Sequence, residues 1–133
     1  MLQWKKNRKL LLAITGGISA YKTPEIVRAL IRSGYELEIV LTEEAERFVS
    51  SMVLSTLAGK RVWKQSDYLS DESGWRIPHI SLAEWPDAVM VIPASAESIS
   101  RAARGEAGTL IGGVLLATRA PVLFFPAMNV NMY

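Results

Sequence analysis

Three short segments combine glycine, hydroxyl or amide residues in patterns that suit the binding of a small anionic ligand. They are TGGISAYKT at 15–23, PASAES at 93–98 and PAMNVNMY at 126–133, and each follows an apolar run. In the first segment, Gly16 and Gly17 would turn backbone N–H groups toward an anion at the start of a helix. The same two glycines also fit a plain tight turn, so the sequence leaves both interpretations open.

The second and third segments carry side chains that can hydrogen-bond a ligand. Ser95 and Ser98 are hydroxyl donors among small residues, which would let a ring or a phosphate approach the backbone. An ordinary N-cap is the alternative interpretation of Ser95. Asn129 offers an amide donor and a carbonyl acceptor, which suits a carboxylate or an amide, although asparagines after strands are otherwise turn residues.

Two familiar nucleotide-binding motifs are not met. The stretch from Gly17 to Thr23 imitates a Walker A loop, but Tyr21 occupies the place of the glycine before the lysine. Asp87 stands at the start of its predicted strand instead of the end, which also argues against a nucleoside triphosphatase. The dinucleotide fingerprint fails because Gly16 and Gly17 are adjacent.

His79 is the only histidine, and its side chain is a candidate general acid or base. The alternative interpretation is a partly buried histidine bonded to a carbonyl. A lone histidine with no acidic cluster beside it disfavours a metal site. The sequence has no cysteine, which excludes a disulfide, a thiolate zinc site and a cysteine nucleophile within these residues.

Apolar runs and glycine stops predict strands that alternate with helices. The strands are expected at 9–15, 35–41, 88–92 and 121–125, and the helices at 21–33, 43–48, 51–58, from Ser95 to near Gly105, and 109–117. Residues 60–78 follow no regular pattern and are expected to form a surface excursion. This alternation predicts a single α/β domain with a parallel, doubly wound sheet. Gly112 and Gly113 would each cost about 1 kcal/mol inside a helix, which indicates close packing by a neighbouring helix, a second subunit or a cofactor.

The composition narrows the class of protein. The 133 residues carry a formal charge of +2, which is too small to argue for a nucleic-acid partner. No segment is long and apolar enough to span a membrane, and the apolar run at 10–14 is too short for a signal peptide, so we expect a cytoplasmic protein. Half of the residues are hydrophobic, which favours an oligomer or a buried cofactor.

Four segments in this order resemble the flavin-containing cysteine decarboxylases: ITGGISAYKTPE at 14–25, VLTEEAERF at 40–48, HISLAEWPDAVMVIPASAESI at 79–99 and PAMNVNMY at 126–133. Within this family, the resemblance is greatest to the phosphopantothenoylcysteine decarboxylase module of bacterial coenzyme A biosynthesis. It implies a Rossmann-like (flavodoxin-like) fold, FMN as cofactor, and homotrimers, often four in a dodecamer, with the flavin at subunit interfaces. The implied reaction is the FMN-dependent oxidative decarboxylation of 4′-phosphopantothenoylcysteine to 4′-phosphopantetheine, which makes the protein a carboxy-lyase.

The resemblance also implies roles for individual residues. His79 would be the active-site base, and Asn129 would bind the carboxylate of a small cysteine-containing substrate. The residues implied to contact FMN are Gly16, Gly17, Ile18, Thr42, Ser95, Ala96, Glu97, Ser98 and Ala127.

Three departures from the family pattern keep other functions open. Glu97 stands where the family usually has asparagine, and Gly108 with Thr109 replaces an acidic-amide pair. The domain at 1–133 is expected to lack the family's C-terminal substrate clamp and reducing cysteine, which follow the last motif. The alternatives are an FMN-binding protein without decarboxylase turnover and a lantibiotic-type peptidyl-cysteine decarboxylase. A flavin prenyltransferase or a dipicolinate synthase subunit is a further alternative, although the phosphate turn of the prenyltransferase is not present.

Overall fold

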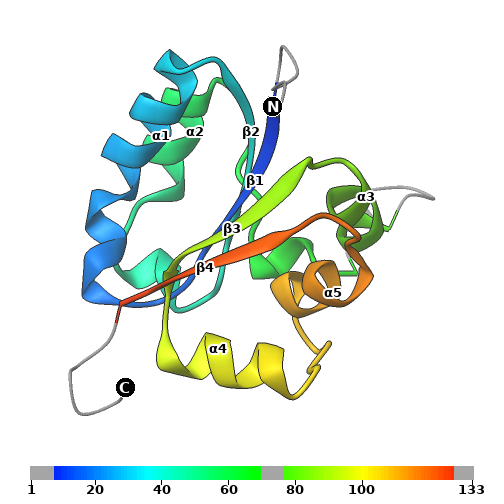
Figure 1. Cartoon of the computed structure of the whole chain (residues 1–133). Coiled ribbons are helices and arrows are strands. Elements are labelled where there is room, and N and C mark those ends of the chain that lie inside the picture. The colour runs from blue at the N-terminus through cyan, green and yellow to red at the C-terminus, as the bar shows by residue number, and fades with distance from the viewer. Residues whose placement is uncertain (1–7, 70–76, 128–133) are drawn as a thin grey trace.

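The computed structural model describes residues 8–69 and 77–127 and contains one four-stranded sheet (Figure 1). Its strands are β1 (Arg8–Ile14), β2 (Tyr35–Leu41), β3 (Ala88–Ala94) and β4 (Val122–Pro126). All neighbouring strands are parallel, in the order β2-β1-β3-β4. The chain therefore builds outward from β1 first in one direction and then in the other, and the predicted doubly wound α/β sheet is confirmed.

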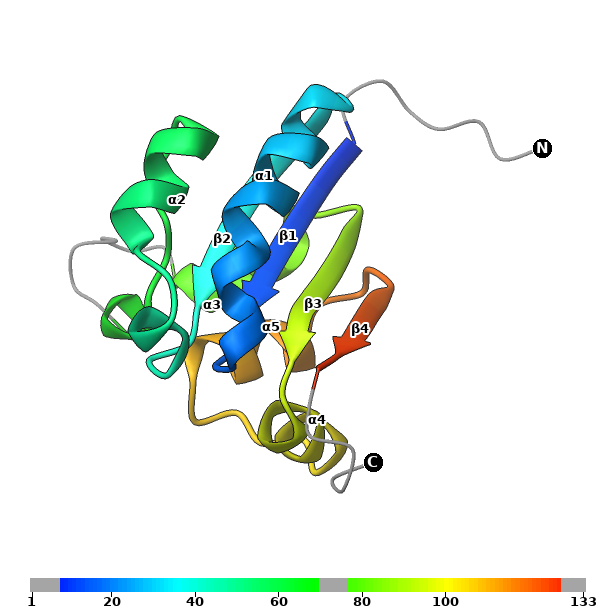
Figure 2. The ribbon, with the colours of Figure 1, turned by 90° about the vertical axis from the view of Figure 1, so that its left-hand side faces the viewer.

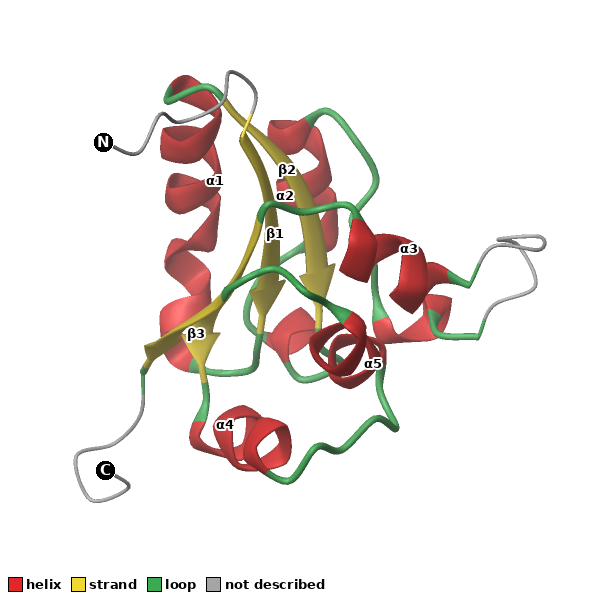
Figure 3. Cartoon of the chain, turned by 45° about the vertical axis from the view of Figure 1, so that its right-hand side comes forward, coloured by secondary structure: helices red, strands yellow, loops and turns green. Residues whose placement is uncertain are grey.

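Helices cover both faces of the sheet. One face carries α1 (Thr23–Arg32) and α2 (Ser51–Ala58), which lie in front of the sheet in Figure 2. The other face carries α3 (Pro78–Glu84) and α5 (Leu110–Ala117), which pack against each other. The remaining helix, α4 (Ala96–Ala103), lies beyond the arrowheads of the strands, at their carboxyl ends (Figure 3).

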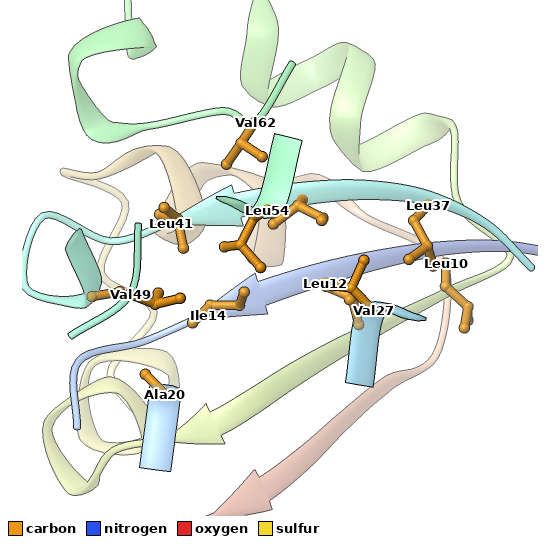
Figure 4. Packing of buried hydrophobic residues seen from close by; sticks show 12 residues of the cluster. Leu10, Leu12, Ile14, Ala20, Val27, Leu37, Leu41, Val49, Leu54 and Val62 are labelled. Atoms are coloured by element: carbon orange, nitrogen blue, oxygen red, sulfur yellow. The ribbon is translucent and has the colours of Figure 1, made fainter. Parts of the chain in front are cut away.

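The core is divided into two clusters by the sheet, because successive side chains of a strand point to opposite faces. On β1, Leu10, Leu12 and Ile14 join the cluster beneath α1 and α2, whereas Leu11 and Ala13 join the cluster beneath α3 and α5. Figure 4 shows the first cluster, in which side chains from the two helices lie over β1 and β2. Burial on both faces explains why the inner strands β1 and β3 read as apolar runs, whereas the edge strand β2 alternates apolar residues with Glu36 and Glu38.

The helix ends follow the caps that the sequence predicts. Gly34 and Gly59 end α1 and α2 with φ angles of 89° and 70°, a left-handed conformation that glycine adopts without a steric penalty. The hydroxyl of Thr109 accepts a hydrogen bond from the backbone N–H of Gly112 at 3.0 Å and so caps α5.

The structure differs from the sequence prediction in three regions. The short helix α3 was not expected, and the helix predicted at 43–48 is only the 3₁₀ turn η2 (Ala45–Arg47). Within the predicted surface excursion, Trp63 forms a bridge to β2, with backbone hydrogen bonds of 2.8 Å to Ile39 and Leu41. The described part of this region is therefore partly attached to the edge of the sheet.

Candidate functional site

A cavity of about 800 Å³ opens at the carboxyl edge of the sheet, a size that suits a drug-sized ligand or a cofactor. Residues that follow all four strands line it. Eight of the residues singled out in the sequence are among them: Gly16, Gly17, Thr42, Ser95, Ala96, Glu97, Ser98 and Ala127. The strand order reverses between β1 and β3, and in open α/β sheets this reversal is where ligands bind.

The ends of β1 and β3 are joined by the side chain of Thr15, which is 1% exposed. Its hydroxyl donates a hydrogen bond of 2.6 Å to the carbonyl of Pro93 and accepts one of 2.9 Å from the N–H of Ser95. Both hydrogen-bonding functions of the hydroxyl are therefore used to hold two of the cavity-lining loops together. Thr15 was not assigned a site role from the sequence, although a threonine at the end of an apolar strand could have indicated it.

The two adjacent glycines after β1 have different surroundings. A Cβ at Gly16 would lie 2.5 Å from the Cβ of Glu44, so the absence of a side chain lets the loops after β1 and β2 meet. A Cβ at Gly17 would meet no described atom within 4 Å. Packing therefore explains why residue 16 is a glycine, whereas Gly17 leaves open space at the cavity wall. Ile18, the next residue, starts the 3₁₀ helix η1 (Ile18–Lys22), is 78% exposed and is not part of the lining.

The loop between β3 and α4 is held by its own two serines. Ser95 is the N-cap of α4, because its hydroxyl accepts a hydrogen bond of 3.1 Å from the N–H of Ser98, which confirms the cap interpretation. The hydroxyl of Ser98 donates back to the carbonyl of Ser95 at 2.8 Å. The cap uses an acceptor lone pair of Ser95, so its hydroxyl hydrogen stays available to a ligand.

Charged side chains surround the part of the cavity next to α4. Arg101 forms an ion pair of 2.6 Å with Glu97, one helical turn away, and lies 3.9 Å from Glu106. Arg104 pairs with the other oxygen of Glu106 at 3.0 Å. The Glu97 carboxylate is therefore held by a guanidinium at the surface of the protein.

The loop after β2 carries the remaining polar part of the lining. The N–H of Thr42 donates to the carbonyl of Ile14 at 3.0 Å, and the hydroxyl of Thr42 accepts from the N–H of Ala45 at 3.1 Å. These bonds fix η2 beside the end of β1. Arg47, the last residue of η2, and Phe48 also line the cavity, and neither residue was assigned a site role from the sequence.

His79 lies on α3 and is not part of this lining. Its Nδ1 atom is buried and has no hydrogen-bond partner in the described residues, and its ring lies 5.8 Å from that of Tyr68. A Cβ at Gly113 would approach the His79 ring to 3.0–3.1 Å, so the neighbouring helix accounts for this glycine. Gly112 instead faces the carbonyl of Glu106 in the loop before its own helix.

Within residues 8–69 and 77–127, no group of three or more histidine, aspartate or glutamate side chains could hold a metal ion. No helix in these two ranges is long and apolar enough to cross a membrane. Asn129 lies outside the described residues, two positions beyond Ala127, whose N–H donates to the carbonyl of Ala94 at 3.1 Å.

Comparisons with known proteins agree with this arrangement. The profile of the family described as Flavoprotein matches residues 2–133. The chain is 42% identical over 128 residues to the coenzyme A biosynthesis bifunctional protein CoaBC of Escherichia coli strain K12, which covers 96% of the chain but 31% of that protein. The chain therefore spans about a third of the length of this curated relative.

Solved structures share the fold over most of their length. HAL3 from Cryptococcus neoformans matches with a TM-score of 0.87 and 29% identity, over 97% of this chain and 75% of that one. A PPC decarboxylase mutant, C175S, complexed with pantothenoylaminoethenethiol matches with a TM-score of 0.83 and 25% identity, over 95% and 70%.

Proposed function

The chain belongs to the flavoprotein family, and we propose that it binds FMN in the 800 Å³ cavity and acts in the oxidative decarboxylation of 4′-phosphopantothenoylcysteine. The observation that carries this proposal is the convergence of Gly17, Thr42, Ser95 and Ala127 on one cavity from four different strand ends. The similarity to CoaBC and to a PPC decarboxylase supports the choice of substrate and reaction.

The residues that line the cavity fit the parts of FMN. Open space at Gly17 and the free hydroxyl hydrogen of Ser95 suit a phosphate or ribityl group. Apolar side chains, which include Phe48, Leu116 and Phe124, supply surface for a flat ring. FMN held there would supply a two-electron oxidant for the thiol-bearing carbon of the substrate, and oxidation of that carbon is what would allow the substrate carboxylate to leave as CO₂.

The protein's own contribution would be a base and a carboxylate anchor. We propose His79 as the base that takes the thiol proton, because an imidazole nitrogen can accept a proton and Nδ1 of this ring has no hydrogen-bond partner among the described residues. We propose Asn129 as the residue that holds the substrate carboxylate through its amide N–H, since the end of β4 lines the cavity at Ala127.

A homo-oligomer would bring His79 next to the cavity that holds the cofactor and the substrate. His79 does not line the cavity of its own chain, so we propose that each cavity is completed by α3 of a neighbouring copy in a trimer or a dodecamer. Ile77 and Ile80, which neighbour His79 in the sequence, are exposed in the single chain, as is Leu69 next to Tyr68, and these apolar side chains supply surface for such a contact.

The test starts with the purified chain, FMN and 4′-phosphopantothenoylcysteine. We expect the protein to retain a yellow flavin through dialysis and to release CO₂ from the substrate. His79→Asn should abolish CO₂ release and keep the flavin. A colourless protein that takes up no FMN would refute the binding proposal, and full activity of His79→Asn would refute the role of the histidine.

A mixing experiment tests the shared site. His79→Asn lacks the base, and Gly17→Leu places a side chain in the open space at the cavity wall. If each cavity is completed by a neighbour, co-expression of the two inactive variants places an intact cavity next to an intact histidine and restores part of the activity. If the co-expressed variants form stable oligomers that bind flavin but release no CO₂, the site is not shared between chains. His79 would then act within its own chain or have no role in the reaction.

FMN binding without turnover is the second candidate function. The observation that favours it is the ion pair between Glu97 and Arg101, which places charged groups where the family usually has a neutral amide. Retained flavin with no CO₂ release from 4′-phosphopantothenoylcysteine or from a peptide ending in cysteine would support this role. CO₂ release from the peptide alone would instead support a lantibiotic-type decarboxylase.

A further inference from the structure

The two arginines that line the cavity differ in whether a carboxylate pairs with them. Arg101 is paired with Glu97 and lies near Glu106, so its charge is balanced by carboxylates. Arg47 forms no ion pair and no side-chain hydrogen bond with any other described residue. Among the described residues that line the cavity, these two are the only cationic side chains. Arg47 is therefore the lining residue whose positive charge is not balanced by a carboxylate among the described residues.

The backbone of Arg47 is fixed relative to the glycine turn, and its side chain is exposed. Its N–H donates to the carbonyl of Glu44 at 3.1 Å, and Glu44 is the residue that Gly16 packs against. Thr42 ties the start of the same loop to the end of β1. Arg47 and the open space at Gly17 are consequently placed by one packed unit, which consists of the loops after β1 and β2.

A phosphate monoester is the ligand group that this combination suits. Such a group carries a charge between about −1.5 and −2 at neutral pH, and neutral N–H and hydroxyl donors alone do not balance that charge. A guanidinium donates two parallel hydrogen bonds to phosphate oxygens in a rigid geometry. The nearby carboxylates of Glu43 and Glu44 add negative charge on exposed side chains, which makes a cation at Arg47 more necessary for anion binding.

We propose that Arg47 binds the phosphate monoester of a ligand in the cavity and makes the site discriminate phosphorylated from unphosphorylated ligands. The inference rests on the proposed function, because that function supplies the two candidate phosphate groups. One belongs to FMN and the other to 4′-phosphopantothenoylcysteine. Both are monoesters and share the chemistry that a guanidinium recognises.

The experiment compares Arg47→Gln with Arg28→Gln. The control makes the same change of charge at an exposed position of α1 that does not line the cavity. Dissociation constants for FMN and riboflavin are measured by flavin fluorescence. If Arg47 holds the cofactor phosphate, Arg47→Gln weakens FMN binding about tenfold to a hundredfold and leaves riboflavin binding unchanged. Arg47→Lys, which keeps the charge but loses the paired donors, should recover part of this loss.

A second arm addresses the substrate phosphate. If Arg47 holds that group, FMN binding stays unchanged, and the KM for 4′-phosphopantothenoylcysteine rises in Arg47→Gln while the KM for pantothenoylcysteine does not. A third arm uses inorganic phosphate as the probe in thermal unfolding without flavin. There the wild-type protein and Arg28→Gln should be stabilised by phosphate, and Arg47→Gln should not.

The outcomes separate this proposal from the proposed function. Loss of phosphate-dependent stabilisation in Arg47→Gln supports the role of Arg47 even if no flavin binds. Wild-type affinities for all phosphorylated ligands in Arg47→Gln, with unchanged stabilisation by phosphate, overturn the role of Arg47 and leave FMN binding and decarboxylation standing. Equal losses for FMN and riboflavin also overturn it, because they indicate a general effect on the cavity.

Discussion

Replacement of Thr15 by valine tests whether the candidate site is organised by the link between β1 and β3. Valine keeps the shape of the buried side chain and removes the hydroxyl, so the N–H of Ser95 loses its acceptor. The carbonyl of Pro93 keeps a weaker bond of 3.3 Å from the N–H of Thr15. One orphaned donor in a mostly buried position costs about 2 kcal/mol of unfolding free energy.

The assay is urea or thermal unfolding of the cofactor-free protein, followed by titration with FMN. For a chain of this length, a loss of about 2 kcal/mol lowers the Tm by about 6–8 °C. The dissociation constant for FMN should also rise about fivefold, because the loop that carries Ser95 is less pre-organised.

Thr15→Ser is the matched control for this prediction, because it keeps both hydrogen bonds and loses only a methyl group. Its cost in stability should be about 1 kcal/mol, with little change in FMN affinity. Equal stability and equal FMN affinity of the valine and serine variants would refute the reasoning, since the hydroxyl would then contribute nothing that the methyl does not.

Four further substitutions test the glycine contacts and the cap of α4. Gly16→Ala should destabilise the protein by about 1–3 kcal/mol in urea unfolding, because its Cβ would collide with the loop after β2, whereas Gly17→Ala should fold with wild-type stability. Equal effects of the two would contradict the packing argument. Ser95→Ala should cost about 1 kcal/mol through loss of the N-cap, and it should also weaken FMN binding; an unchanged flavin affinity would leave Ser95 with a cap role alone. Gly113→Ala should displace the ring of the single histidine, which the NMR shifts of that ring would report, and it should lower CO₂ release while flavin binding is kept.

The inner strands β1 and β3 could be predicted from the sequence because a parallel strand buried on both faces leaves an apolar run, and β2 because its apolar residues alternate with Glu36 and Glu38. The predicted range 35–41 coincides with β2, and the end of α2 was marked by Gly59. The helix α3 was missed for the opposite reason. Its seven residues are too few to show helical periodicity, and its start at Pro78 follows an irregular stretch.

The site was predictable where its chemistry lies in local motifs. The glycine turn and the serine loop were found because each directly follows a strand, and the sheet then brings them together. Thr15 and Arg47 were missed because their roles depend on partners distant in the sequence, such as Pro93, or on the absence of a partner. The sequence also did not predict that His79 lies outside the cavity of its own chain, since a motif does not show toward which part of the structure a side chain points.

The bond between Thr15 and Ser95 also has a consequence for folding. These two residues are separated by 80 positions in the chain, and the loops that they join are brought together only when β3 pairs with β1. The unfolded chain must close this long loop, which slows folding and means that no local segment can hold the ligand by itself. FMN would therefore bind only the folded chain, so a higher concentration of cofactor would lower the fraction of unfolded chains that proteases can attack.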